Sequence, residues 1–437
     1  MRFKTITAFS ASLLMMASCG ASHKATVAND AFAVYDSFNT VFLDSAKYIY
    51  KNTTKDEAAV DRWNGAAAIW CQPMYADMAM NAMLLARKNG DKENEAKYRD
   101  LSNKIIDGNI AHYLNFDFDN NDTNKGWFIY DDIQWWTITM ARAAQVLGRE
   151  DCRELAEKSF ARVWYGSPRV GDTGSYADPA KGLGGGMFWQ WQPLEKPNAN
   201  AADHGKMSCI NFPTVVAAML LYDVAPENRA ADPNPEKWTN NYGDFVRPHY
   251  ETKGRYLEMA KEIYDWASEN LGDMQTGMIS DSSHGGHRGG HPLIYNQGTF
   301  IGAGALLYLA TGDKRYLDNA KAGADYSINV MSAENGVLPW ARNHKNPYDQ
   351  GSLEQGVYPA IWAQYMDILI NDCGQDQYRE FIADNVRQGV SNRNGAGICD
   401  GEMDKKTPDD VLVGSYAASS LPSLMLLFPE YNKEEKK

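Results

Sequence analysis

Apolar residues recur at helical spacing along almost the whole chain, and the strict alternation typical of half-buried β-strands is nearly absent. This periodicity predicts twelve helices in six consecutive pairs. The predicted helices span residues 31–51, 69–87, 92–114, 131–147, 151–164, 207–222, 255–271, 296–310, 314–330, 353–370, 375–390 and 412–427. The fold class is therefore predicted to be all-α.

The two helices of each predicted pair differ in composition. The first is amphipathic and charged, as in residues 255–271, which suits a helix with one face toward solvent. The second is rich in Gly, Ala, Ser and Leu, as in residues 296–310, and small residues let helices approach one another closely. Alternating outer and inner helices predict an (α/α)6 toroid, a barrel of six helical hairpins in a single domain. An α-solenoid is the competing arrangement, but no repeat of fixed period favours it.

The connections between the predicted helices differ in length. Tight turns follow most of the inner helices, at residues 89–91, 148–150 and 311–313. Much longer segments lead into the inner helices, at residues 52–68, 115–130, 165–206, 272–295 and 331–352. In a toroid these long segments emerge on one rim, where we expect them to build a cleft that holds the functional site. Residues 223–253 follow an inner helix and are expected on the opposite rim.

The N-terminus resembles an export signal. Residues 1–18 place Arg2 and Lys4 before an apolar run that is too short to span a bilayer. The run ends in Met16-Ala17-Ser18-Cys19, which resembles a bacterial lipoprotein box in which Cys19 becomes the acylated N-terminus. We therefore expect a signal peptide at 1–18, a tether at 19–30 and a single (α/α)6 domain at 31–430. The protein would be lipid-anchored to the bacterial envelope, on the periplasmic or the cell-surface face of the outer membrane. An ordinary secretory signal followed by a chance cysteine is the alternative.

The charge and the cysteines of the chain narrow the choice of partners. The 437 residues contain 43 Lys and Arg against 56 Asp and Glu, a formal net charge of −13, without a basic cluster beyond the N-terminus. Nucleic acid and anionic membrane surfaces are therefore unfavourable partners. The cysteines other than Cys19 are odd in number and lack metal-ligand spacing, so no disulfide framework follows. Cys71 and Cys209 are expected to be small buried residues of helices.

Aromatic side chains accompany amides and carboxylates in the predicted rim loops, as at Trp63, Trp189 and Trp340. Aromatic planes stack on the apolar faces of sugar rings, and amides and carboxylates bind sugar hydroxyls, so this lining suits a glycan. Some of these aromatics are also expected to serve as core wedges between helices.

Two adjacent carboxylates, Asp131 and Asp132, open a predicted inner helix directly after a rim loop. At a helix start the two side chains can fan into one cleft, and retaining glycosidases need carboxyl groups only about 5 to 5.5 Å apart. The helix N-terminus favours an ionised carboxylate, as a nucleophile requires. The charge of that carboxylate, with burial by the aromatics, raises the pKa of its partner, as a general acid requires. An Asp-Asp pair is also typical of N-capping, but the following Trp135 and Trp136 favour a site.

The segment Tyr130-Asp131-Asp132-Ile133-Gln134-Trp135-Trp136 resembles the catalytic signature of glycoside hydrolase family 76, the endo-α-1,6-mannanases. The Gly184-Gly185-Gly186-Met187-Phe188-Trp189 loop resembles the family's Gly-Gly-Ile-Trp-Trp element, and Tyr295-Asn296-Gln297-Gly298 matches its Tyr-Asn-Gln-Gly. The resemblance implies an (α/α)6 barrel and retaining hydrolysis of α-1,6-linked mannan, with Asp131 as nucleophile and Asp132 as acid/base. Glu354-Gln355-Gly356 departs from the Phe-Lys-Gly of many members, which leaves the substrate contacts at that point open.

The expected ligand is α-mannan polysaccharide or mannooligosaccharide, bound without a cofactor or metal by a monomer that is held at the membrane through its lipid anchor. A metal-binding loop is suggested by His284, His287 and His291, but the glycines between them leave the ligands unfixed. A loop that gates or contacts the substrate is the preferred interpretation. Endo and exo action both stay open. The candidate substrate-binding residues are Tyr130, Trp127, Trp135, Trp189, Gln190, Tyr295, Asn296 and Gln297.

Two alternative functions stay open. Another (α/α)6 glycosidase, such as an unsaturated glucuronyl hydrolase, would need basic side chains for the uronate, and Arg288 and Arg342 are the rim candidates. A lipoprotein that captures glycan without cutting it would need the aromatics but not the paired acids. No Gly-x-Ser-x-Gly or Gly-Lys-Ser/Thr motif supports acyl transfer or nucleotide chemistry.

Overall fold

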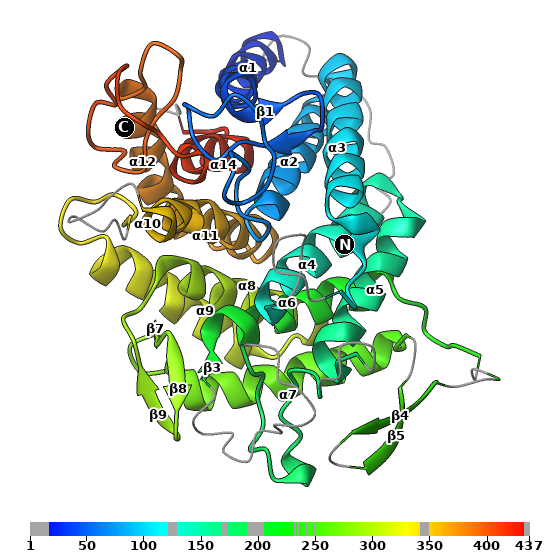
Figure 1. Cartoon of the computed structure of the whole chain (residues 1–437). Coiled ribbons are helices and arrows are strands. Elements are labelled where there is room, and N and C mark those ends of the chain that lie inside the picture. Colours follow the sequence, from blue (N-terminus) through cyan, green and yellow to red (C-terminus); the bar gives the residue numbers. More distant parts are fainter. Residues whose placement is uncertain are drawn as a thin grey trace.

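The computed structural model describes residues 17–120, 129–167, 173–189, 205–230, 233, 236–240, 243–247, 250–340 and 349–431, with residues 17–28, 236, 238–240 and 243–247 described by their backbone alone. Within these ranges, twelve helices form an inner and an outer ring (Figure 1). The inner ring consists of α2 (Gln72–Asn89), α4 (Tyr130–Leu147), α6 (Ser208–Val224), α8 (Ile294–Thr311), α11 (Tyr358–Asp367) and α14 (Ser420–Leu427). The outer ring consists of α1 (Ala17–Phe42), α3 (Lys92–His112), α5 (Glu150–Tyr165), α7 (Lys253–Leu271), α9 (Lys314–Tyr326) and α12 (Arg379–Ser391).

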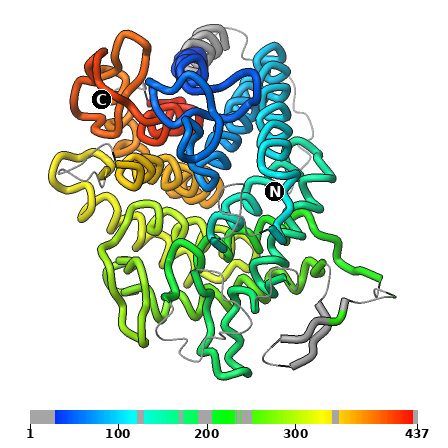
Figure 2. Tube along the Cα trace, viewed as in Figure 1, coloured from blue at the N-terminus to red at the C-terminus, as the bar shows by residue number. Residues whose placement is uncertain are grey.

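The inner helices close into a ring. Each contacts the next one along the chain, and α14 returns to contact α2. The blue N-terminal segment and the red C-terminal helix α14 therefore lie side by side in Figure 1 and Figure 2. The outer helices pack on their inner partners, with α3 on α2, α5 on α4, α7 on α6 and α9 on α8. This arrangement confirms the predicted (α/α)6 barrel.

A repeated Gly-Asp pair makes the tight turns that follow two inner helices. Gly90 and Gly312 end α2 and α8 with left-handed φ angles of 72° and 74°, which glycine adopts without steric cost. The next residue caps the following outer helix, because Asp91 accepts a hydrogen bond from the N–H of Asn94 and Asp313 accepts one from the N–H of Arg315. The chain thus reverses within two residues, as the sequence predicts.

Some predicted helix boundaries are wrong. The helix expected at 31–51 ends at Phe42, and β1 (Leu43–Asp44) and β2 (Ile49–Tyr50) follow as a hairpin. The turn between them is stabilised by Asp44, whose Oδ1 accepts the N–H of Ala46 at 3.1 Å, and Tyr48 adopts a positive φ of 56°.

Two further predicted helices are interrupted. The helix expected at 353–370 consists of α10 (Gln350–Glu354), a 3-10 turn (Gln355–Val357), α11 and a π-helical turn (Ile368–Asp372). Pro359 lies in the first turn of α11, the place in a helix where proline is tolerated. The helix expected at 412–427 consists of α13 (Ser415–Ala418) and α14.

Short antiparallel strands occur in the loops. A three-stranded sheet of β3 (Lys206–Met207), β8 (Ser282–His284) and β9 (His287–Gly289) joins the loop before α6 to the loop before α8. A second hairpin, β6 (Gly272–Asp273) with β7 (Met278–Ile279), lies at the start of the loop before α8. The hairpin of β4 (Glu236–Asn240) and β5 (Gly243–Arg247) belongs to the long connection after α6 and lies apart from the three-stranded sheet in Figure 1.

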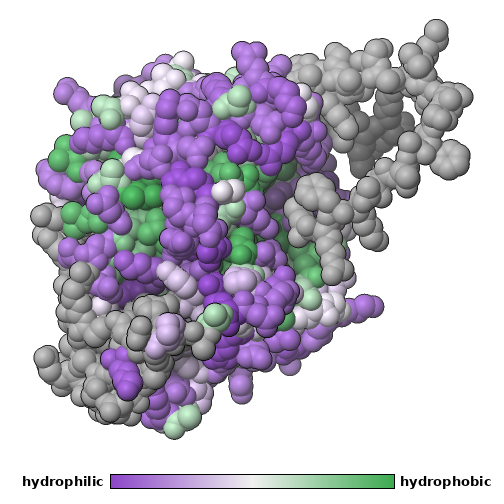
Figure 3. All heavy atoms as spheres, turned by 90° about the vertical axis from the view of Figure 1, so that its right-hand side faces the viewer, coloured by the Kyte–Doolittle hydropathy of each residue, from purple (hydrophilic) through white to green (hydrophobic). Residues whose placement is uncertain are grey.

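The predicted leader lies largely beyond what the structure describes. Residues 1–16 are outside the described ranges, as is the side chain of the predicted lipidation site Cys19. The backbone at 17–30, expected to hold the end of the signal peptide and the tether, belongs to α1. In the described part of the chain, no helix is long and apolar enough to cross a membrane. Hydrophilic residues cover most of the face seen in Figure 3, and hydrophobic residues show between them in separate patches.

Glycine lets neighbouring inner helices approach closely. Gly298 of α8 lies against the backbone of α11, and a Cβ at this position would come within 2.7 Å of the Trp362 Cα. Trp362 itself has no exposed surface, so the close packing around it opposes any displacement of the two helices.

We expect Gly298→Ala to destabilise the protein by about 1–3 kcal/mol, because the added methyl group forces α8 and α11 apart. Chemical unfolding measures this free energy. The control is Gly254→Ala in the first turn of α7, where an added Cβ meets nothing within 4 Å. The control should be neutral or slightly stabilising, since alanine favours a helix over glycine. Equal losses in the two variants would contradict the packing argument.

Candidate active site

Asp131 and Asp132 lie in the first turn of α4, on the rim where the long loops enter the inner ring. The loop ends at Ile129, which has extended backbone angles of φ −96° and ψ 133°. Oδ1 of Asp131 accepts a hydrogen bond from the backbone N–H of Asp132 at 3.1 Å, which satisfies one of the free amides of the helix start. Both residues keep part of their surface exposed, so neither is sealed inside the core.

Asp131 lies near side chains that favour its ionised form. Cys209 and Trp189 lie close enough to its carboxyl group to stabilise the negative charge, and Tyr295 has the same effect on the thiol of Cys209. Burial raises the pKa of Asp131 to about 6, and Cys209 and Trp189 oppose a further rise because they favour the ionised form. Asp131 is therefore mostly ionised at neutral pH, as a nucleophile requires.

Asp131, Cys209 and Tyr295 lie near one another because they occupy the same place in neighbouring helices. Asp131 is the second residue of α4, Cys209 the second residue of α6 and Tyr295 the second residue of α8. Successive inner helices contact one another around the ring, so equivalent positions at their N-termini meet.

Asp132 faces charged groups from a different part of the ring. Burial and the negative charges of Asp131 and Glu354 raise the pKa of Asp132 well above its ordinary value, and Arg62 opposes them. An acid whose pKa is raised keeps its proton near neutral pH and can donate it to a leaving group. The two neighbouring carboxyl groups thus favour opposite protonation states.

The loop that carries Trp189 is pressed against Trp266 of α7. Gly186 has a positive φ of 77°, and a Cβ on it would come within 2.4 Å of the Trp266 ring. The indole N–H of Trp266 donates to the carbonyl of Gly184 at 2.8 Å. Only glycine combines this backbone conformation with so close an approach to the ring.

Lys206 fixes the same loop from the other side. Its Nζ donates to the carbonyl of Leu183 at 2.8 Å, and the backbone N–H of Trp189 donates to the carbonyl of Gly205 at 3.3 Å. The carbonyl of Trp189 accepts the N–H of Tyr130 at 3.3 Å, at the start of α4. Trp189, whose side chain lies near Asp131, is therefore hydrogen-bonded to the helix that carries Asp131.

The other aromatic residues predicted to bind substrate are mostly buried. Tyr295 is 8% exposed and stacks on Tyr358, with ring centroids 4.0 Å apart. Trp135 is 1% exposed and lies 6.4 Å from the Tyr295 ring, and Tyr130 is fully buried beside the guanidinium of Arg162. Trp135 and Tyr130 therefore support the site from the core, as expected of aromatic wedges. Trp127, Gln190 and Arg342 lie outside the described residues.

Asn296 and Gln297, also predicted to bind substrate, have no exposed surface. Nδ2 of Asn296 donates to Oδ1 of Asp281 at 3.0 Å. Nε2 of Gln297 donates to the carbonyl of Gly277 at 2.9 Å, and its Oε1 accepts the N–H of Ile279 at 2.6 Å. Gln297 thus holds the loop before α8, and Asn296 orients the partly exposed Asp281.

The loop with three histidines forms a hairpin. His284 on β8 lies opposite His287 on β9, and Gly285 and Gly286 form the turn with positive φ angles of 59° and 76°. Among the described residues, no group of three or more His, Cys, Asp or Glu side chains could hold a metal ion.

Several side chains near the carboxyl groups were not predicted as part of the site. Cys209 is buried, as expected, but it also lies near Asp131, and its position at the start of an inner helix could have indicated this. Arg62 and Glu354 form an ion pair at 2.9 Å beside Asp132, although 292 positions separate them in the sequence. No local pattern could pair them, because the closure of the ring brings them together.

Comparisons with known proteins agree with this fold. Residues 248–421, less than half of the chain, match the model of glycosyl hydrolase family 76. Curated protein sequences give no match. This match supports the family resemblance and a glycoside hydrolase activity.

Solved structures share the fold over nearly the whole chain. An inactive variant of an α-1,6-mannanase from Salegentibacter sp. HEL1_6, in complex with α-1,6-mannotriose, matches with a TM-score of 0.66 at 18% identity, covering 93% of this chain and 100% of the other. A glycoside hydrolase family 76 mannosidase from Bacteroides thetaiotaomicron matches with a TM-score of 0.66 at 17% identity, covering 93% and 100%. A protein from Listeria innocua matches with a TM-score of 0.66 at 19% identity, covering 92% and 96%.

We expect Gly186→Ala to lower the free energy of unfolding more than Gly182→Ala, by about 1–3 kcal/mol. Both glycines have a positive φ, 77° and 74°, but an added Cβ collides with Trp266 only at Gly186 and meets nothing within 4 Å at Gly182. The difference between the two variants in chemical unfolding therefore reports the contact with Trp266 alone. Equal losses would show that this contact does not hold the loop.

Proposed function

We propose that this protein is a retaining glycoside hydrolase that cleaves α-1,6-mannosidic linkages in mannan, and that it acts within the polymer. The observation that carries the proposal is the pair of adjacent carboxyl groups at the start of α4, one favoured as an ionised nucleophile and the other as a protonated acid. Retaining glycosidases need this division of roles between two close carboxyl groups.

The reaction follows from these two states. Asp131 attacks the anomeric carbon while Asp132 gives its proton to the glycosidic oxygen, so a bond to the enzyme forms as the bond to the leaving sugar breaks. Asp132, now ionised, takes a proton from water. The water oxygen attacks the anomeric carbon and releases Asp131, which restores the enzyme.

Structural relatives support the choice of mannan. The Salegentibacter enzyme is an α-1,6-mannanase whose inactive variant carries asparagine in place of two consecutive aspartates and binds α-1,6-mannotriose. The Asp131-Asp132 pair is likewise consecutive. The charge balance beside Asp132 favours a neutral sugar, since the nearby Arg62 is neutralised by Glu354 and offers no unbalanced cation to a uronate.

The proposed location follows from the lipoprotein box. An acyl chain on Cys19 would hold the enzyme at the bacterial envelope, where a polymeric substrate that cannot enter the cell is within reach.

We expect Asp131→Asn to abolish nearly all turnover of linear α-1,6-mannan, because the amide is no longer an effective nucleophile. Asp132→Asn should lower turnover of mannan about 10²- to 10⁴-fold, but should affect an aryl α-mannoside much less, since an acidic phenol leaves without protonation. Chromatography of the products measures both rates, and a ladder of mannooligosaccharides indicates endo action. Proton NMR of the first product should show the α-anomer, as retention demands.

The matched control is Asp151→Asn, because Asp151 also lies in the first turn of a helix, α5, but on the opposite rim. It should leave turnover unchanged. Full activity of Asp131→Asn on mannan would exclude the assigned nucleophile, and a β-anomer as first product would exclude retention.

We expect a bell-shaped dependence of kcat/KM on pH. Activity should rise with pH through about 6 as Asp131 ionises, and fall at higher pH as Asp132 loses its proton. Cys209→Ala removes a donor that favours ionised Asp131, so the acidic limb should move to higher pH. Cys209→Ser keeps a donor at this place and should move the limb less. The proposed role of the thiol fails if the acidic limb is the same in all three proteins.

A further inference from the structure

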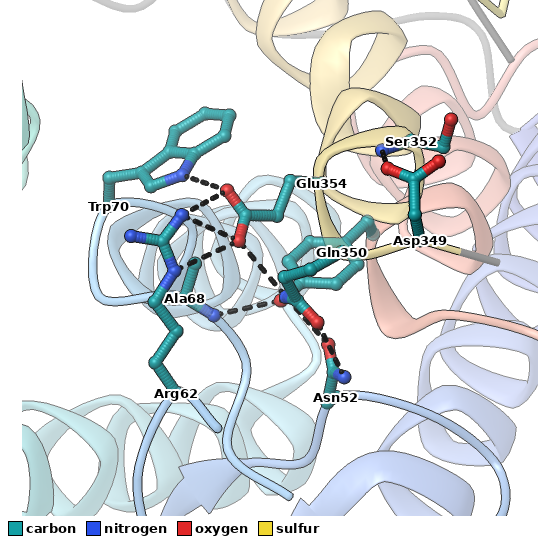
Figure 4. A network of polar contacts seen from close by, with 9 residues as sticks. Asn52, Arg62, Ala68, Trp70, Asp349, Gln350, Ser352 and Glu354 are labelled. Carbon is teal, nitrogen blue, oxygen red and sulfur yellow. Dashed lines mark hydrogen bonds and ion pairs between the residues drawn. The ribbon is translucent and has the colours of Figure 1, made fainter. Parts of the chain in front are cut away.

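A partly buried clamp holds the guanidinium of Arg62 against the carboxylate of Glu354 (Figure 4). Nε of Arg62 donates to Oε1 of Glu354 at 3.1 Å, and Nη2 donates to both carboxylate oxygens at 2.9 Å. The guanidinium also lies over the ring of Trp63, 5.3 Å from its centroid. Such a forked pair fixes the plane of the guanidinium as well as its distance.

Glu354 is anchored independently of Arg62. The carboxylate accepts the indole N–H of Trp70 at 2.9 Å and Nε2 of Gln350 at 3.0 Å, and the residue is only 6% exposed. The amide of Gln350 in turn exchanges hydrogen bonds with Asn52, as Figure 4 shows. Trp70 and Gln350 therefore fix the position of the Glu354 carboxylate, and Arg62 binds to this fixed carboxylate.

The clamp is tied to the helix that carries Asp132. Trp136 lies one helical turn after Asp132 on the same side of α4, and its indole N–H donates to the carbonyl of Ile69 at 3.1 Å. Ile69 directly precedes Trp70, which binds Glu354. The loop with Arg62 thus cannot shift without disturbing contacts to α4 or α10.

The charges that act on Asp132 come from several elements. Among the described residues they are Asp131 on α4, Arg62 on the loop before α2 and Glu354 on α10. Cys71 and Tyr113 also face Asp132, but burial raises the pKa of both, so they stay neutral near neutral pH.

We propose that Glu354 and Arg62 are positioning residues for the proposed hydrolysis: the clamp fixes a cation beside Asp132 and cancels its charge, so that the acid/base keeps its proton. An unpaired guanidinium at this place would favour ionised Asp132 and deprive the leaving group of its proton donor. The inference rests on the proposed function and concerns a point where the chain departs from the family pattern, at Glu354-Gln355-Gly356.

The charge balance can be tested with a double-mutant cycle. Glu354→Gln leaves Arg62 uncompensated and should lower the pKa of Asp132 by about one unit, whereas Arg62→Gln with Glu354→Gln removes both charges and should restore it. Carbon NMR titration of protein labelled at aspartate Cγ reads this pKa directly, with Asp132→Asn to assign the signal. The basic limb of kcat/KM should move to lower pH in the single variant and return in the double variant.

A purely structural clamp would destabilise the fold without moving the pKa of Asp132. The control Glu95→Gln breaks the ion pair of Glu95 with Arg87 at the turn between α2 and α3. The side chain of Arg87 is 37% exposed and that of Arg62 is 39% exposed, so the two pairs are comparable in exposure. This control should leave the pKa of Asp132 unchanged. The proposal is overturned if Glu354→Gln leaves that pKa unchanged, or if the shift persists in the double variant.

Two further measurements decide the proposal if Glu354→Gln does not fold or if the unaltered protein does not cleave mannan. If Glu354→Gln does not fold, Arg62→Gln alone should raise the pKa of Asp132, because Glu354 then faces it unopposed, and an unchanged or lower value overturns the proposal. If the unaltered protein does not cleave mannan, the proposed function fails, while the NMR titration still decides whether the clamp controls Asp132.

Discussion

The common direction of the inner helices is the constraint on which the site depends. A long connection leads into each inner helix, through α10 for α11 and through α13 for α14. The inner helices α2, α4 and α8 are followed by a tight turn into the packed outer helix. The N-termini of the inner helices therefore gather on one rim, and the closure of the ring by α14 against α2 keeps them there. Helix N-termini carry partial positive charge, so this rim is a favourable place for two adjacent carboxyl groups.

Close packing fixes the inner helices and the rim loops in position relative to their neighbours. Gly298 lets α8 meet the backbone of α11, and Gly186 lets the loop of Trp189 lie flat on Trp266. Both contacts leave no room for a methyl group, so α8 is fixed against α11 and the loop of Trp189 is fixed against α7. Asp131, Cys209 and Tyr295 meet as a consequence of helix packing and need no dedicated loop.

The hydrophobic pattern predicted the helices and their pairing because a helix that buries one face must repeat every 3.6 residues. It failed where local side-chain hydrogen bonds overrode the pattern, as at Asp44, which ends α1 at a hairpin. The carboxyl pair was predictable because its residues are adjacent in the sequence. The burial of Trp135 and Gln297 and the pairing of Arg62 with Glu354 were not, since they depend on which side of each helix meets the closed ring.

The different roles of the two aspartates arise from the geometry of one helix turn. Consecutive residues of an α-helix point about 100° apart, so Asp131 and Asp132 face different neighbours. Asp131 lies near Cys209 of α6 and near Trp189 of the preceding loop, which favour its ionised form. Asp132 turns toward the loop before α2 and toward α10, where a cation and an anion compensate each other. A barrel that surrounds one dipeptide with unlike neighbours on its two sides can therefore give two identical side chains opposite protonation states.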